Sequence, residues 1–261
     1  MYPHHAQTIQ NVTDYFQRDP AVLALLLSGS IAHGFESAAS DVDIMIFLAE
    51  EEYQKRLQTG QITFFNTELS TYAGGYVDGK YLSLNFVKQV LAKGSEPARF
   101  AFEGSRVLFS RVDSFAEDVC KIAEYPVAEK AERIKRFYAQ FEAWHWYSGE
   151  ALAKGNQYLL GTSVSKLILF GGRLILAHNQ MLYPYYKWFL KVLENAREKP
   201  SDLLASIQSL TETPTAETVE AFYERVKTFQ PWSDNPHHWP VQFLFYSELN
   251  WVDGHTPVDD L

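Results

Sequence analysis

Two aspartates separated by one residue are the side chains of this sequence best suited to chemistry. Asp41 and Asp43 lie in the segment Ser40-Asp41-Val42-Asp43, directly ahead of an apolar run. Alternate residues of a strand project to the same face, so we expect both carboxylates on one side. Two adjacent carboxylates repel each other unless a cation lies between them. Mg²⁺ is the expected cation, because it commonly binds one or two carboxylates together with substrate phosphates.

A glycine-serine pair upstream of the aspartates adds a second chemical feature. Gly29-Ser30 directly follows the apolar stretch Leu25-Leu26-Leu27-Ser28. Glycine permits a backbone turn that other residues resist, and it lets the main chain approach a ligand closely. The residues after it can open a helix whose free amide groups attract a phosphate. A phosphate-holding turn beside a metal-holding aspartate pair indicates phosphoryl or nucleotidyl transfer, in which two ions about 3.5–4 Å apart can stabilise the attacking and leaving oxygens.

Buried strands are expected to position these residues. Apolar runs predict strands over residues 21–27 and 41–48, with Gly29-Ser30 at the end of the first and the aspartates at the start of the second. Helical periodicity and a charged stretch predict helices over residues 9–18 and 50–58. Alternation predicts two further strands over residues 62–69 and 75–87.

The second half of the sequence has a helical pattern. Helices are predicted over residues 115–123, 127–153, 162–178, 185–197, 200–211 and 216–229. We therefore expect two domains, an N-terminal domain of strands and helices over residues 1–110 and a helical domain over residues 111–261.

The motif resembles a known family. Gly29-Ser30, Gly34 and Ser40-Asp41-Val42-Asp43 are similar to the glycine-serine and paired-aspartate signature of the DNA polymerase beta-like nucleotidyltransferase superfamily. The motif covers residues 28–46, and the resemblance extends to about residue 110. The short N-terminal domain followed by a helical half is similar to the small-molecule members, of the kanamycin nucleotidyltransferase-like and minimal types.

This resemblance implies a fold and a ligand set. The fold is α+β, with an N-terminal mixed-sheet nucleotidyltransferase domain followed by a C-terminal helical bundle that binds the substrate. Magnesium, as two ions, is held by Asp41 and Asp43. ATP or another nucleoside triphosphate rests its phosphates on Gly29 and Ser30, with Ser40 in the same binding motif. An arginine often stands three residues after the serine in this family, and His33 occupies that place here.

The family has a third carboxylate on a later strand, and two registers compete for it. One register places Asp78 there, where it would bind metal or deprotonate the attacking hydroxyl. The other places Ser83 there and leaves the position without an acid. We favour Asp78, although Asp78-Gly79 is also a favoured pair for a hairpin turn.

Four residues of the helical half are further candidates. Glu142 lies in the aromatic segment 141–150 and is our candidate general base toward the acceptor, with His145 second and a surface glutamate as the alternative. Lys166 and Arg173 are candidates for contacts with the triphosphate. A buried arginine needs an anionic partner, which a carboxylate of the protein would also supply.

The expected reaction is metal-dependent transfer of a nucleoside monophosphate, AMP from ATP, onto a hydroxyl of a small-molecule acceptor, with an antibiotic among the candidates. Two alternatives stay open. One is a protein-modifying adenylyltransferase of a toxin–antitoxin type, and the other is a non-catalytic nucleotide-binding module that keeps the fold.

Composition limits the partners. With 23 basic and 32 acidic side chains, the net charge is −9, which argues against an extended nucleic-acid partner. No run of eighteen uncharged apolar residues occurs, so no membrane association is expected. The single cysteine, Cys120, excludes an internal disulfide, and the polar first twenty residues do not resemble a signal peptide, so we expect a cytoplasmic protein. The sequence leaves the oligomeric state open, with a homodimer as one option.

Overall fold

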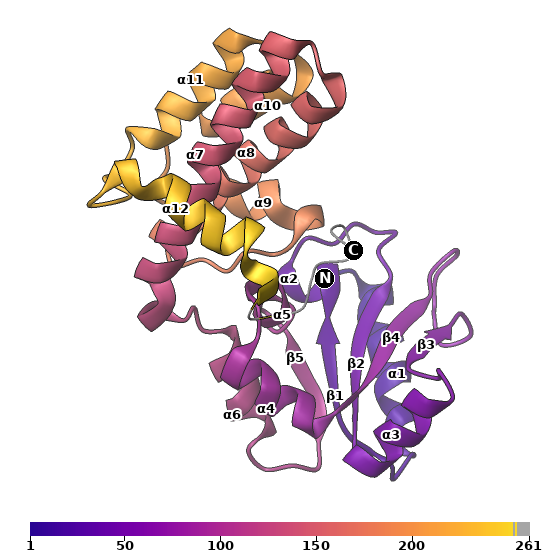
Figure 1. The fold of residues 1–261 in the computed structure, drawn as a ribbon. Coiled ribbons are helices and arrows are strands. Elements are labelled where there is room, and N and C mark those ends of the chain that lie inside the picture. Colours follow the sequence, from indigo (N-terminus) through magenta and orange to yellow (C-terminus); the bar gives the residue numbers. More distant parts are fainter. Residues whose placement is uncertain (253, 255–261) are drawn as a thin grey trace. The chain divides into compact units, whose positions relative to one another are not determined.

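The chain folds into two compact units, which span Met1–Glu124 and Tyr125–Leu261. The computed structural model describes residues 1–252 and 254. The first unit contains a mixed sheet with helices, and the second is built from helices, so the predicted α+β fold class is confirmed (Figure 1). The division between the units follows a helix over Phe115–Ala123, beyond the change of pattern near residue 110.

Within the described residues the strands form one sheet in the order β3-β4-β2-β1-β5. Its central strand β2 is antiparallel to β1 and parallel to β4, while β3 and β5 are antiparallel edge strands. The strands are β1 (Val22–Ser28), β2 (Val42–Leu48), β3 (Thr63–Asn66), β4 (Val77–Ser83) and β5 (Arg106–Ser110). The sequence predicted β1 to β4 but not the short edge strand β5.

The helices of the first unit cover both faces of this sheet (Figure 1). They are α1 (Pro3–Gln17), α2 (Gly29–His33), α3 (Glu50–Gln58), α4 (Leu84–Lys93), α5 (Glu96–Phe100) and α6 (Phe115–Ala123). The strand predicted over residues 75–87 is wrong after Ser83, because α4 begins there. The Ser83 hydroxyl accepts a hydrogen bond from the Phe86 amide at 3.3 Å and caps the helix, which buries Val87 and Val90.

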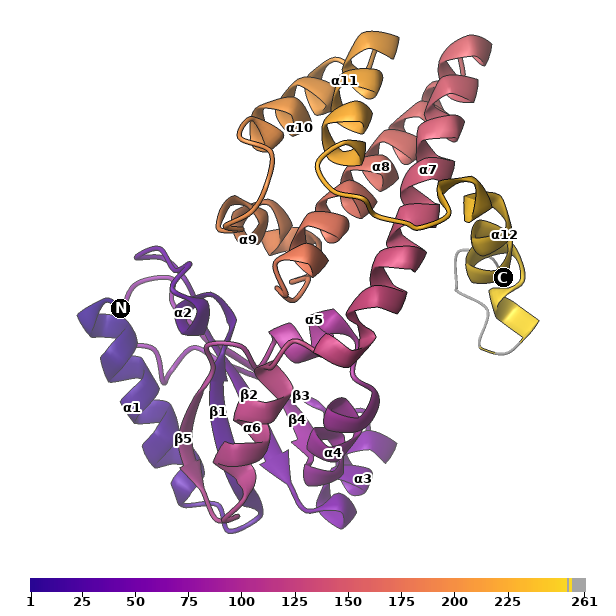
Figure 2. The same cartoon turned by 90° about the vertical axis from the view of Figure 1, so that its left-hand side faces the viewer.

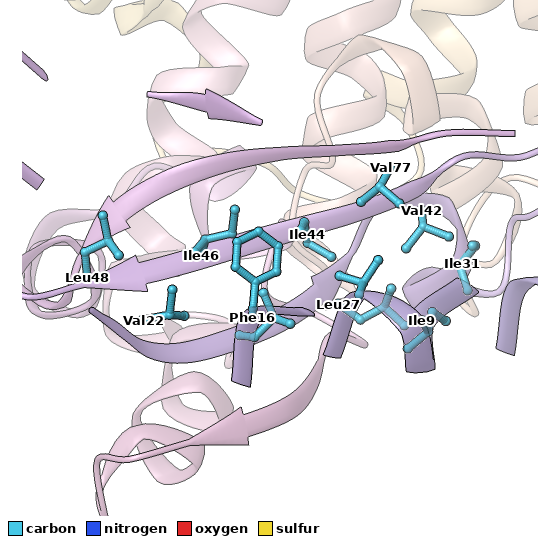
Figure 3. Close-up of a cluster of buried hydrophobic side chains, with 12 residues drawn as sticks. Ile9, Phe16, Val22, Leu27, Ile31, Val42, Ile44, Ile46, Leu48 and Val77 are labelled. Carbon is cyan, nitrogen blue, oxygen red and sulfur yellow. The ribbon is translucent and has the colours of Figure 1, made fainter. Parts of the chain in front are cut away.

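Alternation along the central strands builds two separate cores. Side chains such as Leu27, Ile44 and Ile46 face Ile9 and Phe16 of α1 (Figure 3). The intervening residues, among them Leu26, Met45 and Phe47, pack on the opposite face against the apolar side chains of α4 and α6. Because both faces are covered by apolar side chains, β1 and β2 read as continuous apolar runs.

The second unit is built around a long helical hairpin of α7 (Lys130–Lys154) and α8 (Gln157–His178) (Figure 2). Gly155 ends α7 in the left-handed conformation, and the Asn156 side chain accepts a hydrogen bond from the Leu159 amide at 3.1 Å to start α8. The remaining α-helices are α9 (Phe189–Glu194), α10 (Leu203–Glu212), α11 (Ala216–Lys227) and α12 (Trp239–Phe243). Short helical turns complete the unit as η1 (Val127–Glu129), η2 (Tyr186–Trp188), η3 (Pro236–His238), η4 (Leu244–Glu248) and η5 (Asn250–Val252).

Helix α8 is apolar for a structural reason. Among the described residues it is the one helix that is long and apolar enough to cross a membrane by length and composition. Half of its apolar window is buried inside the unit, where residues such as Leu167 and Leu174 are fully enclosed. This is the pattern of the central helix of a bundle.

Candidate active site

The glycine-serine pair forms the predicted turn from β1 into a helix. Gly29 opens α2 with φ +67°, a left-handed conformation that glycine adopts without strain. Its backbone lies against the Asp43 side chain, since a Cβ atom added to Gly29 would lie 1.8 Å from Asp43 Oδ2. Only a residue without a side chain fits between the turn and this carboxylate. Gly29 therefore brings the turn and the first strand of the motif into direct contact with Asp43.

Sheet register places a second carboxylate next to Asp43. Asp43 pairs with Ser28 of β1 on one side and with Asp78 of β4 on the other. Their neighbours Val42 and Val77, also a register pair, both enter the α1-side core, so Asp43 and Asp78 project together to the opposite face. Asp41 precedes β2 by one residue and is partly exposed, like Asp43.

Asp78 lies inside a strand, so the hairpin-turn alternative is wrong. Its carboxylate is exposed and accepts a hydrogen bond from the Gly79 amide at 2.9 Å. Ser83, the competing position, pairs with Leu48 at the far end of the parallel β2/β4 ladder. It lies five positions after Asp78, about 16 Å along the strand. Ser83 is also buried as the cap of α4, so the sheet brings Asp78, and not Ser83, beside Asp43.

A tyrosine that the sequence analysis did not single out lies among the three carboxylates. The charge of Asp41, and a hydrogen bond that the Tyr76 phenol donates to it, raise the pKa of Tyr76. The charges of Asp78 and Asp43 raise the pKa further. All three acids are therefore within electrostatic reach of one hydroxyl. Tyr76 stands two residues before Asp78, and this same-face spacing was the available signal in the sequence.

The loop before Asp41 is held by hydrogen bonds. The Ser40 side chain accepts a hydrogen bond from the Ser37 amide at 2.9 Å, and its carbonyl accepts one from the Tyr72 hydroxyl. Burial and the charge of Asp41 both raise the pKa of Tyr72. Ser40 thus fixes the loop that presents Asp41, and its hydroxyl is used within this turn.

The remaining residues of the predicted phosphate site lie in or beside α2. Ser30 is buried in its first turn. His33 ends the helix and stacks on Phe100, with ring centroids 4.3 Å apart and planes 15° apart. Burial lowers the pKa of His33 below its ordinary value of 6.5, so the ring is neutral at pH 7. Any phosphate contact of His33 would come from a neutral N–H group.

The donor set of the site matches magnesium in type. Within residues 1–252 and 254, no three His, Cys, Asp or Glu side chains are grouped as a ready metal site. Magnesium does not need such a group, because it takes one or two carboxylates and completes its shell with water and substrate phosphates. The paired oxygens of Asp41 and Asp43, with Asp78 in register, fit this requirement, and the close approach of Gly29 limits the space beside Asp43.

Glu142 is a buried residue of α7, so the surface alternative for it is wrong. Its exposed fraction is 8%, and its carboxylate accepts a hydrogen bond from the Tyr223 hydroxyl at 2.8 Å. Tyr138 donates a second hydrogen bond to it. Burial and these hydrogen bonds to the carboxylate raise the pKa of both phenols. His145 stacks flat on Tyr223, with ring centroids 3.6 Å apart, and its Nε2 lies 2.9 Å from Glu220.

Lys166 and Arg173 lie on α8 in different surroundings. The Arg173 guanidinium is placed over two aromatic rings, 4.0 Å from the centroid of Phe137 and 4.8 Å from that of Tyr183. These rings account for a cation inside an apolar helix. Lys166 is half-buried and lines a cavity of the helical unit. Whether either residue contacts a triphosphate stays a prediction.

Comparison with known proteins identifies the sheet unit. Residues 10–94 match the family model described as polymerase beta, nucleotidyltransferase, a range that includes Gly29, Asp43 and Asp78. A comparison with curated proteins gives no match. A solved nucleotidyltransferase-like protein from Exiguobacterium sibiricum 255-15 is similar with a TM-score of 0.49 and 9% identity, over 98% of this chain and 83% of that chain. The family match confirms what the glycine-serine and paired-aspartate motif predicted for this segment: residues 10–94 are similar to the nucleotidyltransferase domain of the polymerase beta family.

Proposed function

We propose that this protein transfers a nucleoside monophosphate, AMP from ATP, to a hydroxyl group of a small-molecule acceptor and releases pyrophosphate. The observation that supports this most is the register of the central strands, in which Asp43 stands between the Gly29 turn and Asp78. Phosphoryl transfer needs a backbone turn that binds the phosphates and carboxylates that bind a cation. Here the turn and a carboxylate are in contact.

Each residue of the site has a proposed role. The backbone at Gly29 and Ser30 holds the β- and γ-phosphates and aligns the α-phosphorus with the acceptor oxygen. Asp41 and Asp43 hold the cation, and the hydrogen bonds at Ser40 and Tyr76 orient Asp41. The acceptor oxygen forms a bond to the α-phosphorus, the bond to pyrophosphate breaks, and the hydroxyl proton passes to a carboxylate.

We propose that Asp78 is the carboxylate that accepts the proton of the acceptor hydroxyl. It is exposed, and it lies next to Asp43 on the same sheet face. Glu142 is less suited, because its buried carboxylate already accepts two phenol hydrogen bonds. Magnesium, when bound, would neutralise phosphate charge and favour the departure of pyrophosphate. Positioning and electrostatics supply the catalysis in this scheme.

The acceptor is proposed to be small and the protein cytoplasmic. The net charge of −9 disfavours a polynucleotide, and an acidic chain attracts a cationic acceptor such as an aminated antibiotic. A small acceptor is favoured over a protein acceptor because the helical half resembles that of the small-molecule members of the superfamily. No feature of the described residues adds support to a protein target.

Isothermal titration with ATP, GTP, CTP and UTP in the presence of Mg²⁺ tests the site. The wild type should bind at least one of them in a magnesium-dependent manner, and Asp41→Asn/Asp43→Asn should lose that magnesium dependence. Asp14→Asn, at an exposed aspartate of α1, is the matched control and should bind as the wild type does. Equal magnesium-dependent binding by all three proteins would contradict the assigned site.

A further inference from the structure

The helical unit contains a cavity whose lining residues have no assigned role in the proposed reaction. It has a volume of about 1540 Å³ and is bounded by α7, α8 and the segment from α12 to η5. Aromatic side chains come from each of these walls, including Trp144 of α7, Tyr158 of α8 and Trp251 of η5. Rings on several sides suit a flat ligand, because a ring can stack on one wall and meet ring edges on another.

Hydrogen bonds keep the wall formed by the C-terminal segment in place. Gln140 of α7 accepts a hydrogen bond from Trp144 at 3.0 Å and donates one to Ser247 of η4. The Tyr246 hydroxyl donates to Glu132 at 2.6 Å, and the Arg136 guanidinium lies 4.6 Å from the centroid of the Tyr246 ring. These hydrogen bonds connect η4 to α7, so the C-terminal wall of the cavity is fixed to the helical hairpin.

One face of α8 forms the opposite wall. Tyr158, Thr162, Lys166 and Phe170 follow one another at intervals of four residues, which places them on one side of a helix. Tyr158 is 86% exposed, so packing inside the unit does not account for its ring. Trp251, another ring of the lining, is also exposed, and contiguous exposed apolar patches mark binding surfaces.

The charges of the lining favour an anion. Arg136 and Lys166 are basic, and Glu248 is the acidic residue among the described lining residues. Arg136 is already paired with Glu132 at 3.1 Å. In the part of the chain that the structure describes, Lys166 has no hydrogen-bond or ion-pair partner. A half-buried ammonium group without a partner gains most from a ligand that brings a negative charge.

We propose that this cavity binds a planar aromatic anion, whose ring lies among the aromatic walls and whose anionic group meets the Lys166 ammonium. Stacking on aromatic side chains selects the flat shape, and Lys166 selects the negative charge. Arg136 is already paired with Glu132, so a cationic ligand would bring its charge mainly against the Lys166 ammonium. All the lining residues belong to the helical unit, and none of the metal or phosphate ligands assigned in the proposed reaction is among them.

Fluorescence titration with 8-anilinonaphthalene-1-sulfonate, an aromatic sulfonate, tests the proposal. Lys166→Met should weaken its binding by about tenfold, because a charge-assisted hydrogen bond is lost. Tyr158→Ala should also weaken it, and Glu248→Gln should strengthen it. Lys191→Met, at an exposed lysine of α9 outside the cavity, is the matched control and should leave the affinity unchanged.

Two further measurements distinguish binding in this cavity from a loss of folding or from nonspecific dye binding. The uncharged dye Nile red should respond to Tyr158→Ala but not to Lys166→Met, and circular dichroism should show the same helix content in every variant. Asp41→Asn/Asp43→Asn should bind the sulfonate as the wild type does, so the result is independent of the proposed reaction. Equal sulfonate affinity in Lys166→Met, Lys191→Met and the wild type would overturn the proposal.

Discussion

Replacing Gly29 by alanine should disable the active site through a contact that the structure measures. An added Cβ would lie 1.8 Å from Asp43 Oδ2, whereas real Cβ contacts stay beyond 3.0 Å. The carboxylate must therefore retreat by at least about 1.2 Å, and a misplacement of about 1 Å can reduce an enzymatic rate about 100-fold. A non-glycine residue at φ +67° also costs about 1–2 kcal/mol of folding free energy.

Gly34→Ala separates these two effects. Gly34 has φ +71°, but an added Cβ would meet nothing within 4 Å. Gly34→Ala should lose about 1–2 kcal/mol in urea unfolding, and Gly29→Ala should lose at least as much, because its Cβ also overlaps Asp43. Only Gly29→Ala should weaken magnesium-dependent ATP binding in titration calorimetry and slow pyrophosphate release about 100-fold. If the two variants bound ATP and released pyrophosphate equally well, the close contact between Gly29 and Asp43 would have no catalytic meaning.

Three other predictions test separate parts of the molecule. Asp78→Asn should abolish pyrophosphate release, whereas Ser83→Ala should remove only a helix cap, about 1 kcal/mol in urea unfolding; similar activity of the two would place the third acid elsewhere. Because burial lowers the pKa of His33, the unfolded state binds more protons, so stability is full above about pH 6.5 and falls as the pH drops below it. His33→Phe should make thermal stability less dependent on pH in this range, and an unchanged slope would refute the assignment. Glu142→Ala should destabilise the protein by about 2–3 kcal/mol in urea unfolding, because Tyr223 and a second phenol lose a buried acceptor; no loss would show that these hydrogen bonds do not stabilise the unit.

The sequence predicted the parts of the fold that local pattern determines. The helix over Glu50–Gln58 and the helix over Phe115–Ala123 have the predicted bounds. Strand β1 is shifted by one residue at both ends, and β2 begins one residue later than predicted. Apolar runs and charged helical segments carry this information within a few residues. The motif of glycine, serine and paired aspartates also predicted the family. This motif is specific because it requires a glycine-serine turn, two aspartates and an apolar strand at a defined spacing in the sequence.

Other features depend on contacts between distant segments. The sequence alone left Asp78 and Ser83 in competition, and only the parallel pairing of β2 and β4 brings Asp78 beside Asp43. The end of β4 was also misjudged, because Leu84 to Val87 suits either a strand or a helix until Ser83 caps it. The burial of Glu142 depends on a contact with Tyr223, which is far away in the sequence, so the local pattern does not distinguish it from a surface glutamate.

Manganese titration followed by electron paramagnetic resonance tests the central claim most directly. The protein would be titrated with Mn²⁺ in the presence of a non-hydrolysable ATP analogue, with Asp41→Asn and Asp43→Asn alongside the wild type and Asp14→Asn as the control. Carboxylate ligation predicts tight Mn²⁺ binding by the wild type and the control, and binding weakened at least about tenfold in the other two variants. Equal Mn²⁺ affinity in all four proteins would contradict a metal-dependent nucleotidyltransferase site at these aspartates.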